Sequence, residues 1–89
     1  MRPIRTTARF ERDLKLARKR GKNLDKTWHV IGVLQRSQKL ESRHRQHRLS
    51  GDWGAFWECH IEPDWLLIWD DAADALVLVR TGTHANLFG

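Results

Sequence analysis

The chain lacks the features that stabilise secreted proteins or anchor proteins in membranes. Its single cysteine, Cys59, excludes an intramolecular disulfide. No apolar run approaches the length of a membrane span, and residues 1–5 contain no apolar core of a secretory signal. These absences predict a cytoplasmic protein in a reducing compartment, with no membrane partner.

The chain also lacks internal repeats, low-complexity segments and the length needed for a second core. Its 89 residues suffice for one domain, which we expect to span residues 1–89. A composition of 40% hydrophobic and 30% charged residues is typical of a folded globular protein.

Basic residues are scarce in the second half of the chain. Residues 51–89 contain only one of the sixteen Lys and Arg residues, but seven of the eleven acidic residues. Residues 1–50 therefore carry fifteen basic side chains against four acidic ones. Such an asymmetry indicates a basic face for a polyanion, and a nucleic acid is the first candidate.

The start of the chain predicts a short strand followed by a helix. Residues 2–6 form the strand, which Pro3 restricts to a sheet edge or a strand start. Thr7 is a candidate N-cap of the helix, and Gly21 supplies its end. The apolar stripe of this helix consists of Phe10, Leu14 and Ala17.

A second helix begins near Asn23 or Asp25 and forms an antiparallel hairpin with the first. Its expected stripe consists of Leu24, Trp28, Val30, Ile31 and Leu34. After a polar connection over residues 36–43, the apolar period changes from 3.6 to 2. Strands are predicted over residues 43–49, 55–61, 64–69 and 75–81. Their short connections predict an α+β fold, with an N-terminal strand and an antiparallel helical hairpin packed on a small, mainly antiparallel β-sheet.

This topology gathers polar side chains at one end of the sheet. His60 ends one strand and Asp64 begins the next, while Arg80 and His84 end the strand that returns to the same place. A fifth candidate, His47, is harder to locate. With a turn at residues 50–53, it lies opposite Phe56, about 10 Å from His60 along the strand. By the same count His44 lies closer to His60 than His47 does. Strand counting therefore leaves open which of the two histidines joins the cluster.

Imidazoles beside a carboxylate suit general acid–base catalysis near neutral pH, because histidine titrates there. Cleavage of RNA needs little more: a base for the 2′-hydroxyl, an acid for the leaving 5′-oxygen and a cation near the phosphate. This chemistry requires no metal and no cofactor. Nucleophilic catalysis by Cys59 is disfavoured, because adjacent strand residues such as Cys59 and His60 point to opposite faces. A zinc site is also disfavoured, since its possible ligands match no common spacing; they are His44, His47, Cys59 and His84.

Several of these residues lie in motifs that resemble the YafQ-type branch of the RelE superfamily of bacterial toxins. The motifs cover about half of the chain. They are His47-Arg48-Leu49-x-Gly51-x-Trp53, His60-Ile61-Glu62-Pro63-Asp64-Trp65-Leu66-Leu67-Ile68 and Arg80-Thr81-Gly82-Thr83-His84-x-x-Leu87-Phe88. The resemblance implies a RelE-like fold and a toxin–antitoxin toxin that cleaves mRNA in the A site of the ribosome. It also implies a cognate antitoxin in a hetero-oligomeric complex, with the basic helices contacting ribosomal RNA.

The resemblance assigns catalytic positions to His47, His60, Asp64 and His84, and so prefers His47 over His44. In this interpretation His47 is the base and His84 the acid, while Asp64 and His60 orient groups or stabilise charge. Trp65 and Phe88 match positions that hold the RNA, although a core role for Trp65 is also open. Arg80 is a phosphate-contact candidate from its position. Two other functions remain as alternatives: a non-catalytic toxin on the same fold that binds a protein such as a topoisomerase, and an RNA-binding protein that uses the basic helices alone.

Overall fold

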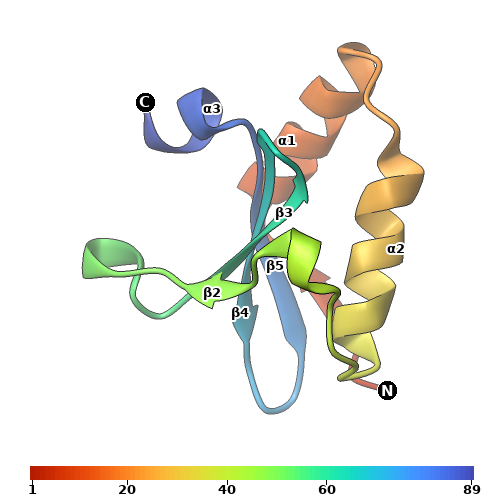
Figure 1. Ribbon diagram of the computed structural model, residues 1–89, viewed down its shortest axis with the longest axis vertical. Helices are drawn as coiled ribbons and strands as arrows, with labels where there is room; N and C mark the ends of the chain where they lie inside the picture. The colour runs from red at the N-terminus through yellow and green to blue at the C-terminus, as the bar shows by residue number, and fades with distance from the viewer.

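The computed structural model describes residues 1–89 as helices packed on one five-stranded sheet (Figure 1). The strands are β1 (Ile4–Thr6), β2 (His47–Arg48), β3 (Trp57–Glu62), β4 (Trp65–Asp71) and β5 (Leu76–Gly82). The α-helices are α1 (Ala8–Lys19), α2 (Leu24–Gln35) and α3 (His84–Phe88), and two short 3₁₀ helices are η1 (Ser42–His44) and η2 (Gly51–Trp53). The strand order is β1-β5-β4-β3-β2, with β1 parallel to β5 and every other pair antiparallel. The predicted α+β fold is confirmed.

The caps of the two long helices form as the sequence predicts. The Thr7 hydroxyl oxygen accepts the backbone N–H of Phe10 at 3.0 Å, and the same hydroxyl donates to the Val79 carbonyl of β5 at 2.7 Å. Asn23 caps α2 by accepting the N–H of Asp25 at 3.0 Å. An N-cap of this kind contributes about 1 kcal/mol. Thr7 thus both starts α1 and fixes its first turn to the sheet.

One face of the sheet is covered by the α1–α2 hairpin (Figure 1). The buried residues of this larger core are Phe10, Leu14, Ala17, Val30, Ile31, Leu34, Leu40, Cys59, Ile61, Trp65, Leu67, Trp69, Leu76 and Leu78. Alternate residues of β4 point the other way, and Leu66 and Ile68 pack there against Leu87 of α3. The sheet therefore buries both faces of β4, and the second, smaller core supports the C-terminal helix.

Two details of the predicted helices and strands are wrong. Trp28 is 45% exposed and Thr27 is buried in its place on the inner face of α2, whereas Val30, Ile31 and Leu34 are buried as predicted. The strand expected over residues 43–49 is reduced to His47–Arg48, because η1 and the left-handed Arg45 (φ 49°) interrupt the extended backbone. The C-terminal helix α3, which Thr83 caps through the N–H of Asn86, was not expected.

The β3–β4 hairpin has a two-residue connection, Pro63–Asp64, between the paired residues Glu62 and Trp65. A register irregularity separates His60 from Glu62 in β3. His60 lies opposite Leu66, which in turn lies opposite Gly82 at the end of β5. The hairpin connection and the end of β5 therefore meet at one end of the sheet, as expected. None of the helices is long and apolar enough to cross a membrane.

Candidate active site

Asp64 and His84 form a carboxylate–imidazole pair between the β3–β4 connection and the first residue of α3. Asp64 Oδ1 accepts the backbone N–H of His84 at 2.9 Å and lies 2.7 Å from His84 Nδ1. The backbone hydrogen bond, followed by the imidazole hydrogen bond, lowers the pKa of Asp64 below its usual value. Because the ionised carboxylate only accepts hydrogen bonds, Nδ1 of His84 carries a proton and Nε2 is left available for a substrate.

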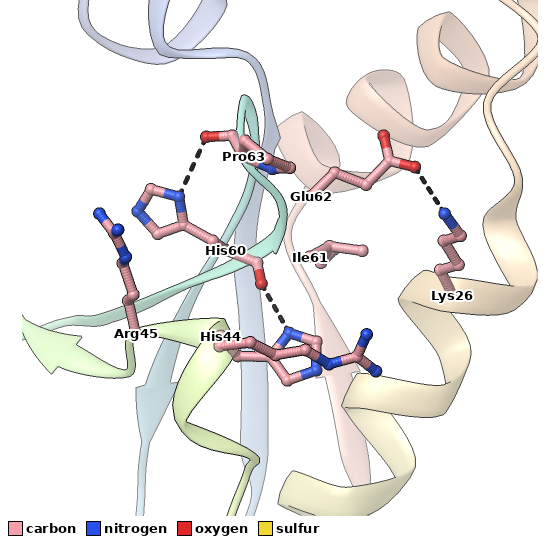
Figure 2. Close-up of a pocket in the computed structure, with 8 residues that line it drawn as sticks. Lys26, His44, Arg45, His60, Ile61, Glu62 and Pro63 are labelled. Atoms are coloured by element: carbon pink, nitrogen blue, oxygen red, sulfur yellow. Dashed lines mark hydrogen bonds and ion pairs between the residues drawn. The ribbon is translucent and has the colours of Figure 1, made fainter.

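His60 lies beside this pair on β3. The centroids of the His60 and His84 rings are 5.7 Å apart, with the ring planes tilted by 55°. His60 Nδ1 lies 3.1 Å from the Pro63 carbonyl oxygen (Figure 2), which can only accept, so the ring is protonated at Nδ1. Both imidazoles are therefore held through Nδ1 by oxygen atoms of the protein. This leaves two Nε2 atoms for proton transfer at one site.

His47 is held on both of its ring nitrogens. Its Nδ1 lies 2.7 Å from the Arg45 carbonyl oxygen and its Nε2 lies 3.2 Å from Glu58 Oε1. His47 and Glu58 are directly opposite each other in the β2–β3 pair, two residues away from the predicted partner Phe56. The shift arises because η2 moves the centre of the turn by one residue along the chain. Both ring nitrogens of His47 are thus occupied by oxygen atoms of the protein, unlike those of His60 and His84.

Glu58 is the residue of this region that the sequence did not single out. Its side chain is only 6% exposed, and Oε2 is buried without a hydrogen-bond partner. A buried carboxylate is costly unless a positive group compensates it, and His47 is the group that contacts it. The one available signal was strand parity, which places Glu58 on the same face of β3 as His60.

His44 is buried and contacts the backbone of His60, not the polar side chains of His60, Asp64 and His84. The residue is 6% exposed, and its Nδ1 lies 2.7 Å from the His60 carbonyl oxygen (Figure 2). Since a carbonyl only accepts, His44 donates this bond and fixes the backbone of β3 where its register is irregular. The two imidazoles therefore have different surroundings: His47 is exposed and contacts Glu58, whereas His44 is buried.

The sequence of the chain matches a family of known proteins. Residues 2–89 match the profile of a family described as the bacterial toxin of type II toxin–antitoxin system, YafQ. The mRNA interferase toxin YafQ of Escherichia coli strain K12 is 37% identical over 89 residues, which are 99% of this chain and 97% of that protein. The chain belongs to the YafQ family of type II toxin–antitoxin toxins.

Solved structures of bacterial toxins agree closely with this fold. The toxin in the E. coli DinJ–YafQ toxin–antitoxin complex superposes with a TM-score of 0.91 at 37% identity, covering 99% of this chain and 98% of that one. A metal-bound toxin from Helicobacter pylori superposes with a TM-score of 0.93 at 38% identity, covering 99% and 100%. The YafQ-type resemblance inferred from the motifs is confirmed over the full length of the chain.

The structure places Trp65 in the larger core of this YafQ-family toxin. The side chain is 4% exposed, and the Lys22 ammonium lies 5.3 Å from the ring centroid. An indole that is so deeply buried has no free face on which a base could stack. The arrangement corrects the expectation of an RNA contact at Trp65 and supports the alternative of a core residue, which anchors the start of β4 next to Asp64.

Arg80 is similarly engaged within the protein. Its Nε and Nη2 lie 2.7 and 3.2 Å from the two carboxylate oxygens of Asp13 on α1, and the two side chains are 14% and 12% exposed. These bonds raise the pKa of Arg80 above its usual value. Asp13 also accepts the N–H of Thr81 at 3.1 Å. Arg80 therefore joins α1 to β5 through two of its three guanidinium nitrogens, which disfavours the expected phosphate contact.

Phe88 is the most exposed of the predicted substrate contacts. Its side chain is 46% exposed, and its ring packs edge-on against Trp53 at a centroid distance of 5.4 Å. Trp53 in turn contacts Phe56 at 6.0 Å. The C-terminal ring is thus supported on one side and open on the other, as a stacking residue would need to be.

Cys59 and the candidate zinc ligands do not form a reactive centre. Burial in the larger core raises the pKa of the Cys59 thiol to about 12, so it is not a thiolate at neutral pH. The chain contains no group of three or more His, Cys, Asp or Glu residues placed to hold a metal ion. The site thus offers imidazoles, two carboxylates and nearby cations.

Proposed function

We propose that this toxin is a ribosome-dependent endoribonuclease that cleaves mRNA in the A site by general acid–base catalysis, without metal or another cofactor. The observation that carries the proposal is the pair of imidazoles of His60 and His84, whose rings lie 5.7 Å apart, beside the Asp64 carboxylate. The E. coli relative carries the name mRNA interferase, which supports the same substrate. Ribosomal mRNA as the substrate also places the toxin in the cytoplasm.

The reaction follows from the two available Nε2 atoms. One imidazole takes the proton of the 2′-hydroxyl, and the resulting oxygen attacks the adjacent phosphorus. The bond from phosphorus to the 5′-oxygen breaks, and the second imidazole protonates that leaving oxygen. The products are a 2′,3′-cyclic phosphate and a 5′-hydroxyl. Each well-placed proton-transfer group typically contributes about 10²–10⁴-fold to the rate.

The hydrogen bonds suggest a division of roles that differs from the simplest family-based assignment. His60 and His84 exchange protons with the substrate, because each retains an available Nε2. Asp64 keeps His84 in the required tautomer by accepting the hydrogen bond of its Nδ1. His47 has both ring nitrogens occupied by Arg45 and Glu58, so it takes no proton from the substrate in this scheme.

The basic N-terminal half provides the affinity for the ribosome. Most Lys and Arg side chains of α1 are solvent-exposed, while the acidic residues cluster in the second half of the chain. Binding that depends on contacts with ribosomal phosphates weakens steeply with salt. A cognate antitoxin completes the system, as DinJ does in the E. coli complex. Such a partner neutralises the toxin in a hetero-oligomer.

The test uses purified toxin and translating ribosomes. The toxin is dialysed against a chelator, the chelator is removed, and the toxin is then added to ribosomes whose magnesium is kept constant. We expect cuts within the translated frame that leave 2′,3′-cyclic or 3′-phosphate ends. Restoration of activity only by an added transition metal would contradict metal-independent chemistry, and an absence of cuts would contradict the nuclease.

A further inference from the structure

A polar groove runs beside His60, between α2 and the η1–β3 region. Its first part is a pocket of about 430 Å³, a size within the range of about 300–1,000 Å³ that is typical of ligand sites. Ile61 is its only hydrophobic lining residue. The lining residues are Lys26, Arg43, His44, Arg45, His60, Ile61, Glu62 and Pro63 (Figure 2).

The groove continues away from the candidate active site along α2. A second cavity of about 290 Å³ shares four lining residues with the first: Lys26, Arg43, His44 and Ile61. It extends to Asp25, His29 and Val30 of α2. One end of the groove is therefore formed by the imidazole of His60, and the other end lies on the helix. A ligand that enters the site at His60 can continue along this channel.

The positive charges of the groove are not all compensated within the protein. Glu62 is paired with Lys22 and Lys26 at 3.3 and 3.0 Å, and these hydrogen bonds lower its pKa. Arg43 has only a solvent-exposed contact of 3.5 Å with Glu41, which contributes little. Arg45 makes no salt bridge. The two guanidinium groups thus remain available to an anionic ligand.

Arg45 connects the groove to the catalytic cluster. Its backbone adopts the left-handed conformation (φ 49°, ψ 48°), which is unfavourable for a residue with a long side chain. In this conformation its carbonyl accepts from His47 Nδ1 at 2.7 Å, while its side chain lies beside the His60 ring (Figure 2). The strained residue therefore positions one histidine and places a cation next to another.

We propose that this groove binds the RNA strand on one side of the scissile phosphate, with Arg43 and Arg45 contacting consecutive backbone phosphates. The inference deepens the proposed nuclease function and rests on it. A single-stranded RNA suits the groove because its phosphates repeat at every nucleotide and Arg recognises them by paired hydrogen bonds. Ile61 and Val30 are the only hydrophobic residues among the side chains that line the two cavities, which disfavours an amphipathic protein helix that needs a row of hydrophobic contacts.

The experiment measures binding separately from cleavage. The probes are 2′-O-methyl oligoribonucleotides of two to eight residues, which lack the attacking hydroxyl, and binding is followed by fluorescence anisotropy. For the parent protein, affinity should rise with length as the strand fills the groove. In the double variant Arg43→Gln/Arg45→Gln this gain should disappear, and the affinity for the longest probe should fall by about tenfold or more. The salt slope should decrease by about 1.4, because each phosphate contact on a single strand contributes about 0.7.

The matched control is Arg36→Gln/Lys39→Gln, which removes the same charge from two exposed residues outside the groove. Its affinity should stay within about twofold of the parent at moderate salt, since distant charges are screened. An equal loss of RNA affinity in both variants would show that RNA responds only to the overall charge of the protein, and would overturn the proposal. Unchanged RNA binding with weaker binding of the cognate antitoxin would overturn it in favour of a protein contact. If the parent binds RNA through the groove but cuts nothing on ribosomes, the nuclease function fails while the groove remains an RNA site.

Discussion

The imidazole of His84 and the carboxylate of Asp64 are 2.7 Å apart, and the same oxygen accepts the backbone N–H of His84 at 2.9 Å. The carboxylate therefore fixes both the ring and the start of α3. Asp64 sits in a two-residue hairpin connection, where its backbone is constrained by the strands on either side. The pair is thus positioned by the ends of three elements, β3, β4 and α3.

The first prediction concerns Asp64→Asn. The amide oxygen can still accept from the backbone, but the carboxylate that orients the His84 ring is lost. We expect the cleavage rate to fall by about 10²-fold or more. Because the lowered pKa keeps Asp64 ionised throughout the neutral range, the acidic limb of the pH–rate profile should not come from this residue. The acidic limb should instead reflect the histidine that acts as the base. Single-turnover cleavage at a series of pH values measures the profile.

The sign of the Asp64 contribution to stability follows from the same pKa. Since the folded-state pKa is lowered, the stabilising contribution is present above the usual aspartate pKa and is lost as the pH falls through the lowered value. The parent should therefore lose stability relative to Asp64→Asn only at acidic pH. Urea unfolding of both proteins across the acidic range measures this, and a difference that instead grew above neutral pH would contradict the assignment.

The second prediction concerns His44, which donates to the His60 carbonyl from a buried position. The variant His44→Phe keeps a ring but removes the donor, and a buried acceptor without a partner costs about 1–3 kcal/mol. We expect a folded protein whose kcat falls about tenfold with KM nearly unchanged, because the His60 ring shifts. His44→Asn places an amide donor near the former Nδ1 and should restore part of the rate. Equal activity of all three proteins would exclude a positioning role.

The third prediction separates Arg80 from the chemistry. Arg80→Ala breaks a largely buried pair with Asp13 and should destabilise the fold by about 1–3 kcal/mol. Asp13→Ala should have a similar effect, and the double variant should cost less than the sum of the two. Chemical denaturation measures these values. At a temperature where each variant is folded, cleavage should remain near the parent level, whereas a phosphate contact at Arg80 would make its loss specific to activity.

Most of the fold can be predicted from the sequence because short local patterns determine where its helices and strands begin and end. Thr7 and Asn23 are caps, and Pro63 separates two short strands with alternating apolar residues. Trp28 could not be placed correctly, because the apolar stripe of α2 includes the small buried Thr27, which hydrophobicity alone does not reveal. The α3 helix was missed because five residues carry little periodicity.

The candidate site could be predicted only in part. Hairpin topology brings His60, Asp64 and His84 together, since short antiparallel connections return to the same end of a sheet. The register of His47 depends on η2, a single turn that shifts the pairing by two residues. The contact of Arg80 with Asp13 depends on how α1 lies across β5, which no local pattern specifies. The burial of Trp65 follows from the same packing.

The fourth prediction is that Cys59 is chemically inert in the folded protein. Its side chain is fully buried, and burial, together with the nearby Glu58, raises the thiol pKa to about 12. Iodoacetamide at neutral pH should therefore modify it only at the rate of unfolding, and it should react readily in denaturant. Cys59→Ala should keep the nuclease activity. Rapid labelling of native protein would contradict the buried position.

The most direct test of the central claim is to map mRNA ends in cells that express the parent or the double variant Asp64→Ala/His84→Ala. Antibody detection is used to match the two protein levels. We predict abundant new ends within translated frames for the parent and none above background for the variant. Undiminished cutting by the variant at equal expression would contradict acid–base catalysis by this pair.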